Sequence, residues 1–295
     1  MIPLGSSPSR LPWPPGFAPD ELARLPWREL PAHWRRVDIV SDLHLSPDTP
    51  AIAAALQAHL AQTPADAVWL LGDVFEVWVG DDAAEVEGAF EAQQIAVLAA
   101  AAARPGLQIA LMRGNRDFLL GDALLQRAGV QPLPDPLRVR AWGQTALLTH
   151  GDALCLDDGD YLAFRASVRS PAWQQAFLAR PLVERQAFAR AARERSAQSQ
   201  QQAHAAARAA GEGEPGDIHP DAPAALLDAS GCQRLIHGHT HRPQDHTLPD
   251  GRLCHVLADW REQGGGADAD TSRKFSLTQA QVLVWTPDGL HRQDL

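Results

Sequence analysis

Seven side chains that can bind a metal ion follow five separate apolar runs of the sequence, where each run gives way to a polar segment. They are Asp42, His44, Asp73, Asn115, His150, His239 and His241. Taken singly, each has an ordinary explanation, because Gly-Asp is common in turns and a lone histidine is usually a hydrogen-bonded surface residue. Strand ends meet at one edge of an α/β sheet, so their recurrence after five predicted strands favours one shared site.

The mixture of imidazole, carboxylate and amide groups indicates which ions such a site would take. It suits manganese, iron, zinc or nickel better than an all-oxygen calcium site or a thiolate zinc site. Seven ligands exceed one tetrahedral set, so we expect two ions about 3.5–4 Å apart that share a carboxylate, as in phosphoesterases. We predict that Asp73 is this bridge. Metal coordination lowers the pKa of bound water to about 7, which supplies a nucleophile at neutral pH.

The elements that position these side chains alternate between strands and helices. Short apolar runs that predict buried strands lie at 37–41, 67–71, 108–112, 145–149 and 234–236. Stretches with helical spacing lie between the early strands, at 51–61, 85–103 and 119–128. This alternation predicts an α/β layered domain.

Two segments depart from the alternation. Residues 1–35 are rich in proline and tryptophan and show no period, so we predict an irregular N-terminal extension before a domain at 36–295. From about 160 to 216 the sequence is rich in Gln, Arg and Ala and predicts a helical insertion. Eight arginines against two acids between 165 and 208 leave two interpretations open, an anion-binding face and an ordinary solvated helix pair.

Composition excludes several classes of protein. The 295 residues are 45% hydrophobic and 21% charged, which is enough for one large domain. The net charge of -10 argues against a nucleic-acid partner. No apolar stretch approaches the roughly 18 residues of a spanning helix. The three cysteines form no C-x-x-C pair, so we expect a cytoplasmic protein without a disulfide framework.

The five ligand segments resemble, in order, the signature of the calcineurin-like metallophosphoesterases. The matching blocks are Asp42-Leu-His44, Gly72-Asp73, Gly114-Asn-Arg-Asp117, His150-Gly-Asp152 and Gly238-His-Thr-His241. Within that superfamily, longer strings resemble the enzymes that hydrolyse UDP-2,3-diacylglucosamine in lipid A biosynthesis. These strings cover 71–82, 113–121, 150–158 and 236–243, and the resemblance extends from about 36 to the C-terminus.

The resemblance implies a fold, a reaction and a set of ligands. The fold is a four-layer αββα sandwich with a helical lid at about 160–216. The reaction splits the pyrophosphate of UDP-2,3-diacylglucosamine into UMP and 2,3-diacylglucosamine 1-phosphate (lipid X), usually with two Mn(II) ions per chain. The first ion would be held by Asp42, His44, Asp73 and His241, and the second by Asp73, Asn115, His150 and His239.

Arginine at position 116 stands where most members of the superfamily have a histidine that protonates the leaving group. Arg116 cannot donate a proton at useful pH, but it can bind phosphate oxygens and offset transition-state charge. A phosphate leaving group, whose second pKa is about 6, needs little protonation on departure. Arg116 therefore favours a pyrophosphate substrate over a simple diester. The predicted catalytic residues are Asp73, Asn115, Arg116 and His150.

The resemblance also implies substrate contacts, several of them in the lid. They are Asn115, Arg116, Asp158, Tyr161, Arg193, Ser196, Gln200 and His239. Gln200 and Ala203 depart from the family, which often has Asn and Lys there, so a cationic contact is missing and Arg195 or Arg208 is a candidate replacement. Tyr161 has two interpretations, stacking on uracil and ordinary packing within the lid.

Apolar residues at helical spacing in the lid, together with its arginines, suggest how the chain would meet a lipid substrate. Most of them must pack on the core, but others would line an acyl-chain cleft or rest on the membrane. The hypothesis is a monomer bound peripherally to the inner leaflet of the inner membrane. Two alternatives stay open, a phosphodiesterase or phosphatase acting on another phosphoester and a non-catalytic metal-binding scaffold.

Overall fold

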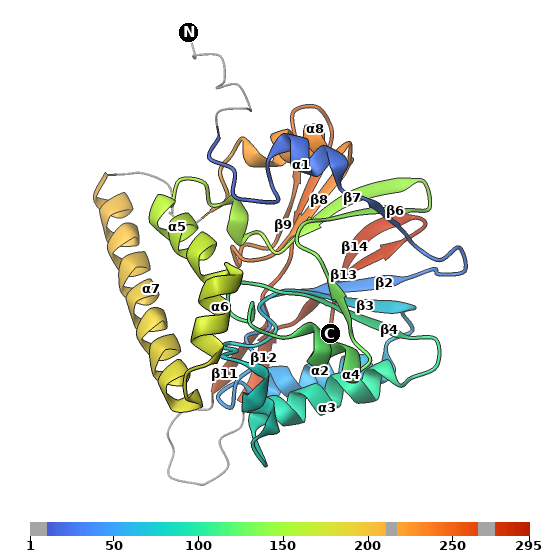
Figure 1. Cartoon of the computed structure of the whole chain (residues 1–295). Coiled ribbons are helices and arrows are strands. Elements are labelled where there is room, and N and C mark those ends of the chain that lie inside the picture. The colour runs from blue at the N-terminus through green and yellow to red at the C-terminus, as the bar shows by residue number, and fades with distance from the viewer. Residues whose placement is uncertain (1–10, 211–216, 265–274) are drawn as a thin grey trace.

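Two six-stranded sheets form the centre of the protein (Figure 1). The structure, a computed structural model, describes residues 11–210, 217–264 and 275–295. In one sheet the strand order is β14-β13-β2-β3-β4-β5, with the bounds Gly289–Asp294, Gln281–Thr286, Val37–Val40, Ala67–Leu71, Gln108–Met112 and Gln131–Leu133. In the other the order is β1-β6-β7-β8-β10-β9, with the bounds Trp27–Glu29, Leu137–Ala141, Gln144–Thr149, Arg234–His237, Leu253–Val256 and Gln244–Thr247.

Helices cover the outer face of each sheet and complete four layers. The helices α2 (Pro50–Gln62), α3 (Phe90–Ala102) and α4 (Asp122–Arg127) lie on one side in Figure 1, and α1 (Pro19–Arg24) and α8 (Ala222–Ser230) lie on the other. Three buried apolar clusters separate the layers, one between the two sheets and one beneath each group of helices. The predicted αββα sandwich is confirmed.

The sandwich explains why the central strands read as unbroken apolar runs. Strand β3 is buried at every position. Its Val68 and Leu70 face the helices, whereas Trp69 and Leu71 pack between the sheets. Strands β2, β3, β4 and β5 run parallel, and parallel strands covered on both faces are apolar throughout. Their carboxyl ends therefore reach the same edge of the sheet.

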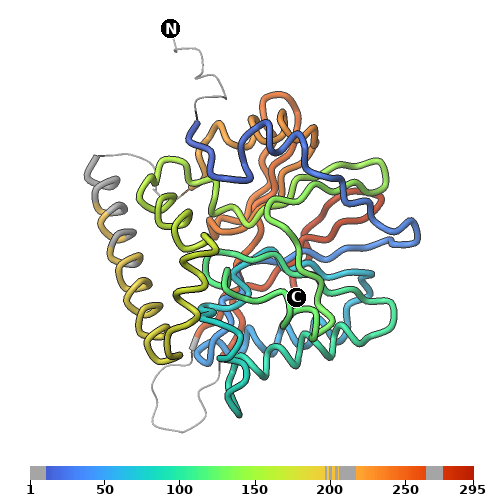
Figure 2. Tube along the Cα trace, in the orientation of Figure 1, coloured from blue at the N-terminus to red at the C-terminus, as the bar shows by residue number. Residues whose placement is uncertain are grey.

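The helical insertion lies between β7 and β8 and contains three helices rather than a pair. They are α5 (Gly159–Val168), α6 (Pro171–Leu178) and α7 (Leu182–Ala210), which Figures 1 and 2 show along one end of the sheets. Ser170 caps α6 by accepting the N–H of Trp173 at 3.3 Å, and Pro171 occupies the first turn, where its missing donor costs nothing.

No helix in the described ranges is long and apolar enough to cross a membrane.

The N-terminal segment is not irregular from residue 11 onward, so that prediction was wrong. Strand β1 pairs in parallel with β6, and Phe17 and Leu22 are buried in the cluster beneath α1 and α8. The Trp27 ring lies 3.9 Å from the Arg138 guanidinium carbon. A six-residue helix and a three-residue strand are too short for a periodic pattern, and contacts with distant residues stabilise them. Residues 1–10 lie outside the described ranges.

Two small β elements complete the fold. Strand β11 (Arg261–Gly264) pairs antiparallel with β12 (Phe275–Gln279). Two short 3₁₀ helices, Asp81–Glu85 and Asp152–Leu154, follow β3 and β7. The helix predicted at 85–103 begins only at Phe90, since the first 3₁₀ helix ends at Glu85 and a turn follows it. Gly88, with a φ of 74°, separates it from α3 because few other residues adopt that conformation.

Candidate metal centre

The seven predicted ligands lie at one end of the two sheets. Loops after β2, β3 and β4 carry Asp42, His44, Asp73 and Asn115, and loops after β7 and β8 carry His150, His239 and His241. Ligand atoms gather in two groups in which every pair lies within 4.8 Å, Asp42 with His44 and His241, and Asp42 with Asp73 and His150. The convergence expected from the strand ends is therefore present.

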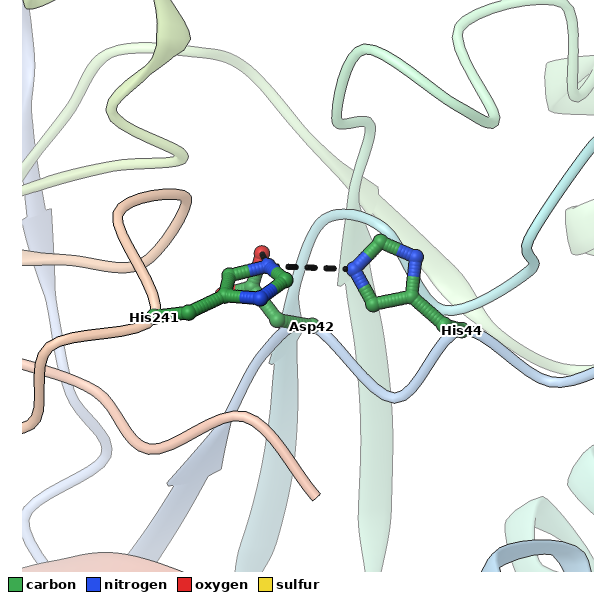
Figure 3. A group of neighbouring side chains, drawn as sticks. All are labelled: Asp42, His44 and His241. Carbon is green, nitrogen blue, oxygen red and sulfur yellow. Dashed lines mark hydrogen bonds and ion pairs between the residues drawn. The ribbon is translucent and has the colours of Figure 1, made fainter. Parts of the chain in front are cut away.

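Two imidazoles face each other in the first group (Figure 3). The Nε2 atoms of His44 and His241 lie 3.2 Å apart, and Nε2 of His241 lies 3.4 Å from Oδ1 of Asp42. A second carboxylate is close as well, since Nε2 of His44 is 4.0 Å from Oδ2 of Asp73. Nitrogen and oxygen ligand atoms thus point toward one small volume.

The other oxygen of Asp73 faces the second group. Oδ1 of Asp73 lies 3.5 Å from Nε2 of His150, which is 3.0 Å from Oδ1 of Asn115. The ring of His239 stands edge-on to that of His150, with centroids 5.3 Å apart. Asp73 therefore lies between two imidazole clusters and presents one oxygen to each.

Outer contacts turn the Nε2 atoms toward the centre. Nδ1 of His150 donates to the carbonyl of Leu71 at 3.0 Å, and Nδ1 of His44 lies 2.6 Å from Oε2 of Glu76. Nδ1 of His241 is 3.4 Å from a carboxylate oxygen of Asp259. Such partners fix the ring tautomer and orientation of metal-binding histidines.

One buried carboxylate oxygen of the centre lacks a hydrogen bond, which bears on whether these residues fit a cation. Oδ1 of Asp42 is buried and has Nε2 of His241 at 3.4 Å, but no polar partner with hydrogen-bond geometry in the described part of the chain. The other oxygen accepts the Ser41 hydroxyl at 2.5 Å and the N–H of His239 at 2.9 Å. A buried acceptor left unpaired costs about 1–3 kcal/mol, which a bound cation would offset. The donor set fits a metal ion.

Backbone conformation also sets these residues apart. Asp42, His44, Asp73, His239 and His241 have φ values of 55°, 48°, 50°, 69° and 55°. Trp142 is the only other non-glycine residue with a positive φ in the described ranges. Each such conformation costs about 1–3 kcal/mol and persists where function needs a side chain in one direction. The strain is concentrated on five of the seven predicted ligands.

Two glycines of the sequence blocks allow the loops to approach the carboxylates. A Cβ on Gly114 would lie 2.1 Å from Oδ1 of Asp73, and a Cβ on Gly238 would lie 2.2 Å from Oδ2 of Asp42. Any side chain at either position would displace a predicted ligand. These glycines are required by close packing rather than by a turn.

The carboxylates create a negative potential inside the centre. Burial alone would lower the pKa of His150, but Asp73 and Asp42 raise it to about 9. Burial and then the charge of Asp73 raise the pKa of Asp117 to about 6. The Asp117 carboxylate accepts the N–H groups of Gly114 at 2.7 Å and Val74 at 2.8 Å, so it joins two ligand loops.

Arg116 lies beside the predicted bridge. Its backbone N–H donates to Oδ1 of Asp73 at 2.8 Å. Its Nε is buried and makes no hydrogen bond with any described residue. Its charge lowers the pKa of Glu76, whose carboxylate lies at the boundary between the centre and the insertion. The guanidinium thus has donors available next to the metal centre.

The insertion brings some of its predicted contacts to the site. The ring of Tyr161 stacks on that of His239, with centroids 6.4 Å apart and planes 25° apart. Its hydroxyl donates to Asp152 at 2.7 Å, and its N–H donates to Asp158, which caps α5. Arg193 forms an ion pair with Glu76. Tyr161 therefore packs within the protein as well as beside a predicted ligand.

Two other predicted substrate contacts are not brought to the centre by any described interaction. Ser196 is exposed on α7, and the side chain of Gln200 lies outside the described residues. Three carboxylates outside the predicted set of site residues stand next to ligands instead, namely Glu76, Asp117 and Asp259. Glu76 and Asp117 lie within the matching strings, which was a usable signal, whereas nothing in the sequence marked Asp259.

A dimetal-type site at the strand ends of an αββα sandwich defines a class of phosphoesterase. Residues 35–243 match the family model described as calcineurin-like phosphoesterase, and the chain belongs to that family. A dimetal phosphatase from Danio rerio covers 88% of this chain and 98% of its own, at 13% identity and a TM-score of 0.40.

Relatives define the branch of the family. A protein named UDP-2,3-diacylglucosamine hydrolase from Xanthomonas axonopodis pv. citri is 45% identical, covering 78% of this chain and 94% of its own. Proteins of the same name from Chromobacterium violaceum and Stenotrophomonas maltophilia are 44% and 43% identical, covering 78% and 86% of this chain and 92% and 98% of their own. Within the phosphoesterases, the chain belongs to the UDP-2,3-diacylglucosamine hydrolases.

Proposed function

We propose that this protein hydrolyses the pyrophosphate bond of UDP-2,3-diacylglucosamine in lipid A biosynthesis, giving UMP and 2,3-diacylglucosamine 1-phosphate. The observation that carries the proposal is the position of Asp73, with one carboxylate oxygen 4.0 Å from His44 and the other 3.5 Å from His150. A bridging carboxylate between two sets of nitrogen ligands is what a pair of metal ions needs. The names of the relatives supply the substrate.

Two Mn(II) ions are the proposed cofactors. Asp42, His44, Asp73 and His241 would hold one ion, and Asp73, Asn115, His150 and His239 would hold the other. When bound, the ions supply positive charge for the phosphate oxygens and lower the pKa of a bound water. The protein contributes the orientation of the ligands, through the Leu71 carbonyl, Glu76 and Asp259.

Removing and restoring the metal tests this function. Protein freed of metal by a chelator should release no UMP, and Mn(II) should restore release more fully than Mg(II) or Ca(II). Bis-p-nitrophenyl phosphate serves as the simple diester control. Turnover of the diester without release of UMP would favour a phosphodiesterase acting on another phosphoester. No turnover of either compound by protein with two bound metals would favour a binding scaffold.

Arg116 is the proposed group that binds the pyrophosphate. Its unpaired Nε and its place beside Asp73 suit phosphate oxygens, and an arginine cannot act as a general acid. Asn115, next to it, would hold both a metal and a substrate oxygen. His150 and Asp73 would complete the catalytic group.

Replacing Arg116 with alanine should lower kcat/KM for the pyrophosphate substrate by about 10²–10³-fold, because one preorganised transition-state contact is lost. Arg116→His, which restores a proton donor, should raise alkyl diester turnover relative to pyrophosphate turnover. Steady-state kinetics on both substrates measure the two effects. Equal losses on both substrates would show that Arg116 does not select the leaving group.

The helical insertion at about 160–216 is the proposed lid of the 36–295 domain. Tyr161 against His239 and Arg193 against Glu76 place α5 and α7 beside the centre. Asp158, Tyr161, Arg193, Ser196, Gln200 and His239 stay the proposed substrate contacts. Asp158, Tyr161 and Arg193 all have partners within the protein, so each would have to exchange or share a contact to bind substrate.

We propose that a monomer attaches to the cytoplasmic face of the inner membrane through the exposed side of this lid. Arg165, Arg169, Arg185 and Arg193 pair with carboxylates inside the protein. Among the described side chains of the insertion, Arg180, Arg190 and Arg195 are exposed as well. Phe164, Leu178 and Val183 are also exposed, by 44%, 41% and 66%. This combination suits an anionic lipid surface.

Binding to vesicles should depend on anionic lipid and weaken with salt. The triple replacement of Arg180, Arg190 and Arg195 by Gln should weaken it about 10²-fold, at about 1 kcal/mol per arginine. Co-sedimentation with vesicles of rising phosphatidylglycerol content measures the change. Replacing Arg24 and Arg127 by Gln, both exposed outside the insertion, is the control. Binding that ignores lipid charge and salt would contradict the proposal.

A further inference from the structure

The carboxylate of Glu76 contacts the metal centre on one side and the insertion on the other. Its Oε2 atom lies 2.6 Å from Nδ1 of His44, and its Oε1 atom forms an ion pair with Arg193 of α7. The side chain is 19% exposed, so it lies at the boundary between core and solvent. One residue therefore touches a predicted metal ligand and a predicted substrate contact at the same time.

The backbone around Glu76 holds this carboxylate in a fixed place relative to His44. The N–H of Glu76 donates to the carbonyl of Leu45 at 3.1 Å, and the N–H of His44 donates to the carbonyl of Asp73 at 3.0 Å. Leu45 also bridges to Phe75. These backbone contacts join the ligand loops after β2 and β3. The side chain of Glu76 can still rotate relative to this joined backbone.

Helix α7 is attached to its neighbours near its beginning. Arg185 is buried and pairs with Asp82, and Phe188 packs against Trp173 and Phe177. Beyond Ala189, the ion pair between Arg193 and Glu76 is the last polar contact between α7 and the core among the described side chains. Because the Arg193 side chain is 46% exposed, its guanidinium can turn to solvent when this contact breaks, and the carboxylate of Glu76, 19% exposed, keeps His44 as a partner.

Charge around Glu76 favours an exchange of partners. One oxygen of Glu76 lies against the imidazole of His44, and the other pairs with the guanidinium of Arg193. The positive charge of Arg116 also acts on this carboxylate, although only Arg193 forms an ion pair with it. A phosphate group beside Arg116 would offer Arg193 a second anion within reach, with more acceptor oxygens and more charge.

Given the proposed function, we propose that Glu76 is a positioning residue that joins the lid to the metal centre. One oxygen orients His44, and the other holds Arg193 of α7 until the substrate pyrophosphate replaces it as the partner of Arg193. The closing of α7 on substrate and the orientation of His44 thereby depend on the same carboxylate.

The attachment of α7 can be measured without metal or substrate. In hydrogen exchange on the metal-free full-length protein, Glu76→Ala and Arg193→Ala should each raise the exchange of amides at 190–202 at least about 10-fold. The double variant should exchange no faster than either single one, since both break the same pair. Glu194→Gln and Arg190→Ala change exposed neighbours on α7 and should have no effect. Unchanged exchange in both test variants would overturn the proposal, whatever the enzyme's substrate is.

Metal affinity separates the two roles of the carboxylate. Glu76→Ala should weaken Mn(II) binding about 10–100-fold, the usual effect of losing a partner of a metal-binding histidine. Glu76→Gln keeps an acceptor for His44 and should lose much less, and Arg193→Ala should lose nothing. Isothermal titration calorimetry measures all three affinities. Equal metal affinities in wild type and Glu76→Ala would contradict the orienting role.

Kinetics test the exchange of partners. Arg193→Ala should raise KM for the UDP-lipid substrate, whereas Glu76→Gln at saturating Mn(II) should lower KM, because the amide competes less well for Arg193. In the Arg193→Ala background, Glu76→Gln should no longer change KM. If Glu76→Gln still changes KM in the Arg193→Ala background, the substitution acts through the electrostatic potential of the site and not through Arg193. That result would contradict the proposed exchange of partners. If the protein hydrolyses a different phosphate substrate but the hydrogen-exchange and metal-affinity results are as expected, the proposed function is wrong and the role of Glu76 stands.

Discussion

Asp73→Ala should lose at least about 10³-fold in Mn(II)-dependent release of UMP, the largest loss we expect from any single change. The variant removes the one carboxylate that faces both imidazole groups, so it removes charge stabilisation at two ions together. Metal analysis should find fewer than two Mn(II) ions per chain.

Thermal unfolding gives a second measurement of the same change. Mn(II) should raise the Tm of the wild type, because it binds the native state alone, and should raise that of Asp73→Ala much less. Asp48→Ala, an exposed aspartate close in sequence to the ligand loop after β2, is the matched control and should behave as wild type. A fully active Asp73→Ala variant would remove the basis of the proposed site.

Asp152→Ala should lower the free energy of unfolding by about 3–5 kcal/mol, the usual cost of breaking a buried ion pair from one side. The Asp152 side chain is fully buried and contacts the Tyr161 hydroxyl, Nε of Arg165 at 2.8 Å and Nη2 of Arg169 at 3.4 Å. These arginines hold its pKa well below the usual range despite burial. Its loss leaves Arg165, 8% exposed, near Asp135 alone at 3.7 Å.

Urea or thermal unfolding measures this loss. Asp157→Ala is the control, because its side chain is 82% exposed and pairs only with His219 at 3.8 Å. That change should cost less than about 0.5 kcal/mol. The double variant Asp152→Ala/Arg165→Met should be more stable than Asp152→Ala, since it removes the unpaired cation. Equal stability of Asp152→Ala and wild type would show that the network does not attach α5 to the sheet.

The central strands were predictable because burial on both faces leaves an unmistakable pattern. Strands β3 and β4 have the predicted bounds, 67–71 and 108–112. The ligands follow from those strands, since a polar residue directly after a buried strand must lie at the sheet edge. Positive φ values at Asp42 and Asp73 could not be predicted, because neither residue type requires them.

Peripheral strands and the insertion depended on contacts that the local sequence does not encode. Strand β9, Gln244–Thr247, is exposed at every residue and forms by pairing with β10. The lid arginines could be counted, but which of them pair inside the protein is set by positions such as Asp82 and Asp152. The local sequence therefore leaves both an anion-binding face and a solvated one possible for the insertion.

The identity of the products tests the central claim most directly. The name of the relatives leaves open which bond of UDP-2,3-diacylglucosamine is hydrolysed, and the substrate has ester, glycosidic and pyrophosphate bonds. Wild-type protein with Mn(II) should release UMP and 2,3-diacylglucosamine 1-phosphate in equal amounts, separated by chromatography and identified by mass. Free fatty acid, or UDP together with 2,3-diacylglucosamine, would contradict pyrophosphate hydrolysis at this metal centre.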